Sequence, residues 1–459
     1  MKKVQEKNGW SLLLLLGLLL TGSTTFVSCT VEDNAIEPQQ EEVAKGFFTD
    51  EINKLIDENY EKVKANGYAE LVIPAAMFDH TFFKIPDNAK GDMDYVINAG
   101  YKAYVFGGTV RDAVVGVASN DVDFTTDATP EELEKIVPNT KIFVAPNGYK
   151  VAQAWHGNDR TDMGTMRAIY YYLRGKDGIP ESSYPTDGTI NVYSKELWED
   201  SYSRDLTINA IYYDGKTGNL IDYHGGLHDI REGVIRSTAD PDAVYPYNAE
   251  ALIRAVRFAA RFGFTIEAET DKAIRKHLSA CDELGAGGIA YDLIKVFHDG
   301  NMTLGYRLMK DYGILDRFFL TLKDTLNTSN YDSYAKAAYA YLDGQNNKDY
   351  AVSLATLFLP VVNKAMQGKT ADLETFKTTY NTLEKDSKQA DYFLIEDAMK
   401  ADMFRLWLLV SQMGDKAVID DATKKAAVKA DSLFAKALLV LQAKAQTDTG
   451  VAKIVDYWK

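Results

Sequence analysis

The sequence has little cysteine and no excess of basic residues. Only two cysteines, Cys29 and Cys281, occur among 459 residues, which excludes a disulfide framework and a zinc site built from cysteines. Lysine and arginine number 51 against 66 aspartates and glutamates, and the formal net charge is −15. This charge argues against a strongly basic nucleic-acid scaffold, so any nucleic-acid contact has to be made by a local surface.

The apolar run nearest the N-terminus is too short to span a bilayer comfortably. It extends from Trp10 to Leu20, follows three lysines and precedes small residues that end at Cys29. This order is typical of a signal peptide, and the cysteine resembles that of a bacterial lipobox. We expect lipidation of Cys29 and a membrane-anchored lipoprotein, periplasmic or at the cell surface. The alternatives are an uncleaved anchor and a misassigned start codon on a cytoplasmic enzyme.

The remaining composition is that of a folded protein. Apolar residues make up 46% and aromatic residues 12% of the chain, and the length allows two or three domains with their own cores. Residues 30–45 are polar and acidic, which is typical of a flexible tether. Helical spacing of apolar residues predicts a helix from Phe47 to Val63 with Asp50 as its N-cap, and helix after helix beyond about residue 290.

A glycine pair followed by two aspartates is the central motif. An apolar strand, Tyr104–Phe106, leads into Gly107 and Gly108, and a short helix with Arg111 in its first turn follows. Glycine lets backbone N–H groups approach a phosphate, and the helix N-terminus and the arginine favour its charge.

The two aspartates follow this helix. Asp121 and Asp123 fall on one face of a predicted strand and can hold Mg²⁺. The two motifs together indicate metal-assisted chemistry on a phosphate.

A third carboxylate is expected near this pair. Residues 149–155 and 161–172 read as two strands of a hairpin, and Asp162 lies near the start of the second strand. Beside the aspartate strand, Asp162 would complete a metal site or act as general base for an attacking hydroxyl. The alternative is a surface aspartate at a turn.

Two later segments carry further candidate ligands. The segment from Trp198 to Tyr213 is predicted to be a helix capped by Asp205. In it, Arg204 and Asn209 would meet the phosphate or sugar of a nucleotide, or instead satisfy local backbone groups.

An amphipathic helix is predicted over residues 249–262. Arg254, Arg257 and Arg261 lie on one stripe of this helix. They would meet phosphates or simply pair with acidic neighbours.

Four motifs in this order resemble the bacterial poly(A) polymerase and CCA-adding enzyme family, the class II group of polymerase β-like nucleotidyltransferases. They cover roughly residues 92 to 280 and are Gly107–Glu131 with its glycine pair and Asp-x-Asp, Arg204–Ala210, Asp222–Arg236, and Arg254–Phe264. The resemblance implies an α+β fold, in which a nucleotidyltransferase head with a small mixed sheet precedes an all-helical neck, body and tail. It also implies two Mg²⁺ ions held by Asp121 and Asp123, a nucleoside triphosphate, and an RNA or tRNA-like acceptor whose 3′-hydroxyl is activated.

The chain departs from the family pattern before the arginine helix. The family carries there an acidic residue and, three positions later, an arginine that read the incoming base, whereas this chain has Asn248 and Ala251. An acceptor and a forked donor are lost, so base selection by that route is not expected. A catalytically weak, membrane-anchored lipoprotein that binds nucleotide or RNA is therefore the alternative to the enzyme.

These inferences define the expected organisation and site, and we expect a monomer. The expected segments are a signal peptide (1–28), a tether (29–46), an N-terminal extension (47–91), the head (92–235), a neck (236–300), and a body and tail (301–459). The expected catalytic residues are Asp121, Asp123 and Asp162. The expected nucleotide-binding residues are Gly107, Gly108, Arg111, Arg204, Asp205, Asn209, Asn248, Arg254 and Arg257.

Overall fold

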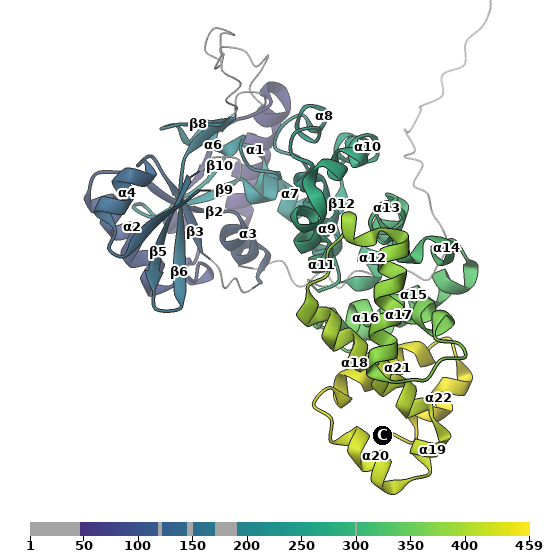
Figure 1. The fold of residues 1–459 in the computed structure, drawn as a ribbon. Coiled ribbons are helices and arrows are strands. Elements are labelled where there is room, and N and C mark those ends of the chain that lie inside the picture. The colour runs from purple at the N-terminus through teal and green to yellow at the C-terminus, as the bar shows by residue number, and fades with distance from the viewer. Residues whose placement is uncertain (1–45, 118–121, 145–149, 170–190, 299–300) are drawn as a thin grey trace, which may run out of the picture. The chain divides into compact units, whose positions relative to one another are not determined.

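A mixed eight-stranded sheet and a long series of helices make up the described part of the chain (Figure 1). The computed structural model describes residues 46–117, 122–144, 150–169, 191–298 and 301–459. The strands of the sheet lie between residues 71 and 222, and the described chain beyond residue 267 is helical. This arrangement confirms the expected α+β class, in which a head with a mixed sheet precedes an all-helical region.

The strands of the sheet are joined in the order β1-β10-β9-β2-β3-β6-β5-β4. β3 and β6 are parallel, and the other neighbours are antiparallel. The bounds are β1 Leu71–Ile73, β2 Ala103–Phe106, β3 Asp123–Thr126, β4 Thr140–Val144, β5 Lys150–His156, β6 Asp159–Thr165, β9 Ile211–Asp214 and β10 Leu220–Asp222. Two short pairs lie outside the sheet: β7 Arg167–Ile169 with β8 Asn191–Tyr193, and β11 Val234–Ile235 with β12 Thr265–Ile266.

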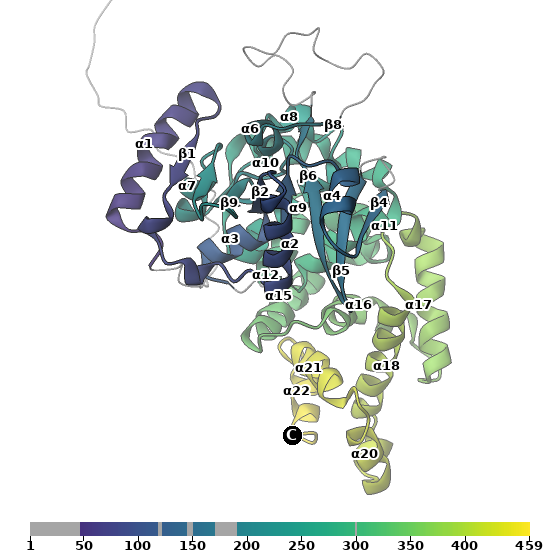
Figure 2. The same ribbon diagram turned by 90° about the vertical axis from the view of Figure 1, so that its left-hand side faces the viewer.

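One face of the sheet is buried by α2 (Asp87–Asn98) and α4 (Pro130–Ile136), and α3 (Gly108–Val115) joins the same core over β2 and β9. Figure 2 looks onto this side, and α2 and α4 lie in front of the strands. Alternation along the strands buries Phe124, Ala152 and Met163 here.

The described residues cover the opposite face only in part. Over β2, β9 and β10 it carries a second apolar cluster, to which the short helix α6 (Leu197–Ser201) contributes. The buried members of this cluster are Met166, Leu197, Tyr212, Ile221 and Tyr223. The apolar cluster on this face therefore lies beside β3, the strand that begins with the candidate carboxylate Asp123.

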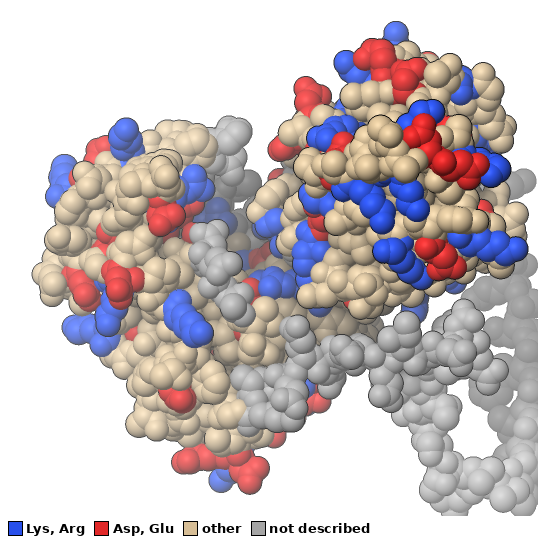
Figure 3. Space-filling model, turned by 90° about the horizontal axis from the view of Figure 1, so that it is seen from below, with Lys and Arg blue, Asp and Glu red and all other residues tan. Residues whose placement is uncertain are grey.

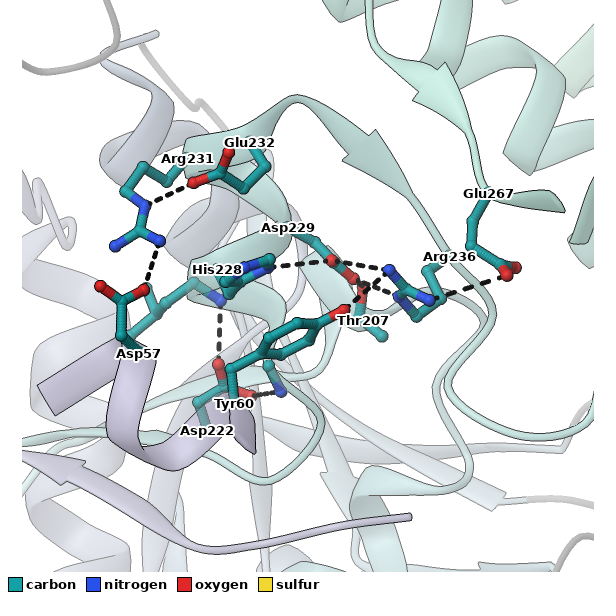
Figure 4. A network of polar contacts seen from close by, with 12 residues as sticks. Asp57, Tyr60, Thr207, Asp222, His228, Asp229, Arg231, Glu232, Arg236 and Glu267 are labelled. Carbon is teal, nitrogen blue, oxygen red and sulfur yellow. Dashed lines mark hydrogen bonds and ion pairs between the residues drawn. The ribbon is translucent and has the colours of Figure 1, made fainter. Parts of the chain in front are cut away.

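Residues N-terminal to the sheet are part of the same core. α1 (Asp50–Asn66) packs on α7 (Gly226–Glu232), and β1 pairs with β10. Figure 4 shows the polar contacts that join them: the buried Asp229 carboxylate accepts from Thr207 and Arg236. Arg236 also donates to the hydroxyl of Tyr60, at 3.0 Å, and the Tyr60 ring stacks on His228.

The helices that follow the sheet confirm the expected helical second half. In chain order they are α8 Pro241–Val244, α9 Ala249–Phe262, α10 Ala268–His277, α11 Gly285–Val296, α12 Met302–Asp311, α13 Ile314–Phe318, α14 Lys323–Leu326, α15 Ser329–Gly344, α16 Tyr350–Ala365, α17 Leu373–Ser387, α18 Asp397–Gly414, α19 Lys416–Ile419, α20 Ala422–Lys429, α21 Phe434–Ala445 and α22 Thr449–Val455. Among the residues described, no helix combines the length and apolar character needed to cross a membrane.

Two expectations about local structure are wrong. Residues 198–213 are not one helix, because α6 ends at Ser201, a 3-10 turn covers Thr207–Asn209, and β9 begins at Ile211. β9 is held between β2 and β10, and pairing on both sides outweighs the helical spacing of its apolar residues. The N-cap of α1 is Thr49 rather than Asp50, since the Thr49 hydroxyl accepts from the N–H of Ile52.

Candidate functional site

Gly107 turns the chain from β2 into α3 (Gly108–Val115). Its φ of 66° and ψ of −130° lie in a region that other residues adopt only with strain. A Cβ added at Gly107 would meet no atom within 4 Å, so the space beside this backbone is open. The first N–H groups of α3 follow directly and have no partners within the helix, as an anion-binding turn requires.

Asp123 and Asp162 lie side by side next to this turn. Asp123 begins β3 and is in register with Asp162 of the parallel strand β6, so both side chains point to the same face. The end of β2 lies beside the start of β3, because these two strands are antiparallel. The glycine turn and the two carboxylates therefore meet at one end of the central strands.

Arg160 forms an ion pair with Asp162. Its Nε lies 3.1 Å from Oδ1 of Asp162, and the Asp162 side chain is 28% exposed. Asp162 lies within β6 and not at a turn, because the turn is made by Gly157 and Asn158. Its position beside Asp123 is the geometry that a metal ligand or general base would need.

The donor set fits magnesium. Mg²⁺ is commonly held by one or two carboxylates together with substrate phosphates, and Asp123 and Asp162 offer two carboxylates beside the open glycine turn. In the described ranges, no three histidine, cysteine, aspartate or glutamate side chains form a metal-binding group. Asp121 lies outside those ranges.

Arg111 lies in the interior and not at the open turn. Its side chain is 5% exposed; Nε donates to Asp112 at 2.8 Å and Nη1 to Asn209 at 2.6 Å. The guanidinium also lies 4.3 Å from the centroid of the Phe258 ring. Burial lowers the pKa of Arg111. Its donors hold α3 against its neighbours, which differs from the expected phosphate contact.

Asp205 and Asn209 continue this set of contacts toward α9. Oδ1 of Asp205 accepts from the Asn209 amide at 2.9 Å, and Oδ2 lies 3.4 Å from Nε of Arg254. Asn209 in turn accepts from Arg111. These expected ligands are brought together, but they contact one another through their polar atoms.

Arg204 is likewise enclosed by head residues. It forms an ion pair with Asp200, donates to the hydroxyl of Tyr212, and its guanidinium lies 3.6 Å from the centroid of the Phe106 ring. Burial acts to lower the pKa of Arg204, but the charges of Asp200 and Tyr212 and the hydrogen bonds to both together outweigh it, and the pKa is raised. Arg204 therefore supports the end of β2, where Phe106 precedes the glycine turn.

The arginine stripe of α9 pairs with acidic neighbours, one of the two outcomes that the sequence left open. Arg257 donates to Asp292 at 2.7 Å, and Arg261 to Asp112 at 3.1 Å. Arg254 also contacts Glu250 and keeps 31% of its side chain exposed. Of the three, it is the most accessible to a ligand.

The two positions that depart from the family pattern differ in how far their side chains are exposed. Asn248 precedes α9 and is partly exposed, whereas Ala251 is fully buried inside the first turn. Ala251 therefore cannot touch a base in this structure.

Sequence reasoning missed the acidic partners of these arginines. Asp112, Asp200 and Asp292 are each at most 7% exposed and each holds an arginine. Only two left a local signal, since Asp112 follows Arg111 directly and Asp200 precedes Arg204 by four residues. Asp292 is 35 residues from Arg257 in sequence, so only the fold brings them together.

The helical region carries charges of both signs. On the face drawn in Figure 3, lysine and arginine side chains gather at the upper right, over the helices that follow the head, with acidic side chains among them. The strongly acidic overall charge therefore does not prevent local basic areas.

Two segments of the chain match family models, and the first contains the glycine turn and the candidate carboxylates. Residues 103–236 match the family described as the poly A polymerase head domain. Residues 263–326 match the family described as the probable RNA and SrmB-binding site of polymerase A.

Curated relatives carry the corresponding names. The chain is 28% identical over 269 residues to poly(A) polymerase I of Haemophilus influenzae, covering 59% of each protein. It is 37% identical over 177 residues to the CCA-adding enzyme of Bacillus licheniformis, covering 38% of this chain and 41% of that protein. The chain thus spans about three fifths of the poly(A) polymerases that it matches.

Solved structures share the fold over most of the chain. The CCA-adding enzyme of Bacillus stearothermophilus in complex with CTP superposes with a TM-score of 0.55 at 19% identity, covering 82% of this chain and 83% of that one. The Thermotoga maritima CCA-adding enzyme complexed with tRNA gives 0.53 at 16% identity, covering 83% and 85%. At these identities the likeness concerns the fold.

The comparisons contradict the expected location. The matched poly(A) polymerases and CCA-adding enzymes are cytoplasmic enzymes that modify RNA, so the expectation of a membrane-anchored lipoprotein in the periplasm or at the cell surface is wrong. The segment behind that expectation, with Cys29, lies outside the described residues.

Proposed function

We propose that this protein transfers a nucleoside monophosphate from a nucleoside triphosphate to the 3′-hydroxyl of an RNA, with Mg²⁺ as cofactor. The observation that carries the proposal is the pair Asp123 and Asp162, in register on parallel strands beside the glycine turn of α3. The match of residues 103–236 to the poly A polymerase head domain supports it, as do relatives named for poly(A) and CCA addition.

Each part of the site has a chemical role in this proposal. The backbone of Gly107 and Gly108 and the first N–H groups of α3 bind the triphosphate. Asp121 and Asp123 would hold two Mg²⁺ ions, which when bound would supply Lewis-acid stabilisation of charge on the phosphate oxygens. Asp162 accepts the proton of the RNA 3′-hydroxyl.

The proposed transfer balances without a further reactant. The RNA 3′-oxygen forms a bond to the α-phosphorus, the bond from that phosphorus to the bridging oxygen breaks, and pyrophosphate leaves. The hydroxyl proton passes to Asp162, and Arg160, 3.1 Å from this carboxylate, keeps it oriented.

The arginines divide into two roles. Arg111, Arg204 and Arg257 are positioning residues, because each gives a short contact to a buried acidic partner. Arg254, which is more exposed, is the arginine of α9 that would reach the nucleotide. Asn248, at the start of the same helix, would contact the base as a neutral donor and acceptor.

Binding of nucleotide or RNA without turnover is the second candidate function. It is favoured by Ala251, which is buried where the family carries a base-reading arginine. Calorimetric titration with ATP and Mg²⁺ separates the two: tight binding with no pyrophosphate release supports the binding protein.

An extension assay tests the enzyme. The full chain is incubated with labelled nucleoside triphosphates, each of the four in turn, Mg²⁺ and a short RNA. We expect RNA extension and pyrophosphate release by the wild type and a loss of about 10³-fold in Asp123→Asn and Asp162→Asn. Asp94→Asn, which changes an exposed aspartate of α2, is the matched control. If wild type neither extends RNA nor releases pyrophosphate, the enzyme is excluded.

A further inference from the structure

The strands β4, β5 and β6 have one buried face and one open face. Ala152, Ala154 and Met163 are fully buried, while the residues between them are half-buried or exposed. Both helices that pack on these strands lie on the buried face: Asp92 of α2 contacts His156 and Glu131 of α4 contacts Lys150. His156 and Lys150 alternate in phase with Ala152 and Ala154.

The open face is the one that carries the candidate carboxylates. Register places Asp123, Asp162, Gln153 and Lys141 in one row across β3, β6, β5 and β4. The neighbouring row holds Arg160 opposite Trp155. The site is therefore continuous with a face of the sheet on which no described helix packs over β4, β5 and β6.

This open surface combines an aromatic ring with cations. Trp155 is 38% exposed, and the guanidinium of Arg160 lies 6.0 Å from the centroid of its ring. The Arg160 side chain is 51% exposed and also contacts Asp162, while Lys141 is exposed in the row of the carboxylates. The ring is thus linked to the candidate general base through one arginine.

We propose that Trp155, with Arg160 and Lys141 beside it, binds the single-stranded 3′ end of the acceptor RNA by stacking one of its bases. The inference rests on the proposed function, because it names the surface that would deliver the 3′-hydroxyl to Asp162. Ring stacking with nearby cations is the usual chemistry of single-strand binding, since every base has a stacking face and every linkage a negative charge.

Charge complementarity and distance favour RNA over a protein partner. Cations beside the ring on a chain of net charge −15 match phosphates. Phe143, 52% exposed on the same face, is separated from Trp155 by the polar row of Lys141 and Gln153, whereas a protein-docking surface would favour a contiguous apolar patch. Neighbouring strands lie about 4.8 Å apart and alternate residues about 6.7 Å, so Trp155 stands roughly 12 Å from Asp123 along the face. A few nucleotides of single strand cover that separation.

RNA binding without turnover tests the proposal. A 5′-fluorescein-labelled oligoadenylate is titrated with the full chain, without nucleoside triphosphate, and followed by anisotropy. A second RNA has abasic nucleotides at the second, third and fourth positions from its 3′ end. The variants are Trp155→Ala, Trp155→Phe, which keeps a stacking ring, and Tyr95→Ala, which removes an exposed ring of α2.

The expected pattern is non-additive. Wild type and Tyr95→Ala bind the abasic RNA about tenfold more weakly than the intact RNA. Trp155→Ala binds intact RNA about tenfold more weakly than wild type and loses nothing further with the abasic RNA, and Trp155→Phe recovers most of the loss. The proposal is overturned if Trp155→Ala binds intact RNA like wild type, or if the abasic RNA still costs this variant tenfold.

Its failure is distinguishable from failure of the proposed function. If wild type extends RNA but Trp155→Ala binds RNA normally, the surface is wrong and the transferase stands. If wild type does not extend RNA but binding shows the expected pattern, the RNA surface stands and the enzyme is excluded.

Discussion

Arg111 in the interior and Arg160 on the open sheet face both lie in the head, but their side chains have opposite surroundings. Arg111, 4% exposed, is enclosed by Asp112, Asn209 and the Phe258 ring. Arg160 is half exposed beside Trp155 and Asp162. A charged residue in a sequence motif is therefore not by itself a ligand, because surroundings decide whether its donors support the fold or face solvent.

The same difference separates the two halves of one sheet face. Over β2 and β9 the alternate residues are Tyr104, Phe106 and Tyr212, and they pack into an apolar cluster. Over β3 and β6 they are Asp123 and Asp162. The same alternation of side chains thus builds an apolar cluster over β2 and β9 and a candidate site over β3 and β6.

The largest expected effect on stability comes from removing the buried side chain of Arg111. Arg111→Ala takes the nearest cation from the buried Asp112, which keeps Arg261, and leaves the acceptor of Asn209 without its donor. The change should lower the free energy of unfolding by about 3 kcal/mol. Arg160→Ala removes a partly exposed ion pair and should cost at most about 1 kcal/mol. Urea denaturation at pH 7 measures both, and equal losses would contradict the comparison.

The free energy of unfolding, measured at several pH values, should show what an enclosed charge such as that of Glu267 contributes to stability. Burial acts to raise the pKa of Glu267, but the N–H groups of Thr270 and Glu269, then Arg236, outweigh it and the pKa is lowered. A lowered carboxyl pKa stabilises the fold above the unfolded value of about 4.3, and that stabilisation is lost as the pH falls through the folded pKa.

We therefore expect Glu267→Gln to lose about 1 kcal/mol at pH 7 and almost nothing near pH 3. The measurement is denaturant unfolding at several pH values. Glu269→Gln is the control and should follow wild type, because Glu269 is an exposed residue of α10, the helix that Glu267 caps. A pH-independent loss would exclude this charge effect.

The smallest effect concerns a side chain that should not react at all. Cys281 is buried, and burial raises its pKa to about 12. In a Cys29→Ala variant, a thiol reagent at pH 8 should therefore leave the folded protein unlabelled and label it fully in denaturant. Rapid labelling of the folded protein would show that the region around Cys281 opens.

The sequence predicted elements whose own periodicity decides them. The helix expected over residues 249–262 is observed with those bounds, because its apolar stripe and Gly263 define it locally. The segment 198–213 was mispredicted because β9 is specified by strands that precede and follow it. The alternation of side chains along β9 is too short to be distinguished from the spacing of a helical face.

The candidate site was predictable to a similar degree. The glycine turn and the neighbouring aspartate follow from short-range pattern, and Asp162 was expected on an adjacent strand, where it lies. The burial of Arg204 and Arg257 was not predictable, since it depends on Asp200 and Asp292 arriving from other elements. Trp155 gave no motif, because exposure on one face is a property of the assembled sheet.

The contacts of α1 have a consequence for synthesis of the chain. Its partners Arg231 and Arg236 follow Asp57 and Tyr60 by 174 and 176 residues. At about 5–20 residues per second of translation, α1 leaves the ribosome roughly 10–35 seconds before these partners exist. Through that interval α1 has β1 beside it but lacks α7, so Ile52 and Ile56 enter only part of their core. The packing of α1 is thus completed only late in synthesis, and until then the nascent chain leaves part of this helix open to chaperones and proteases.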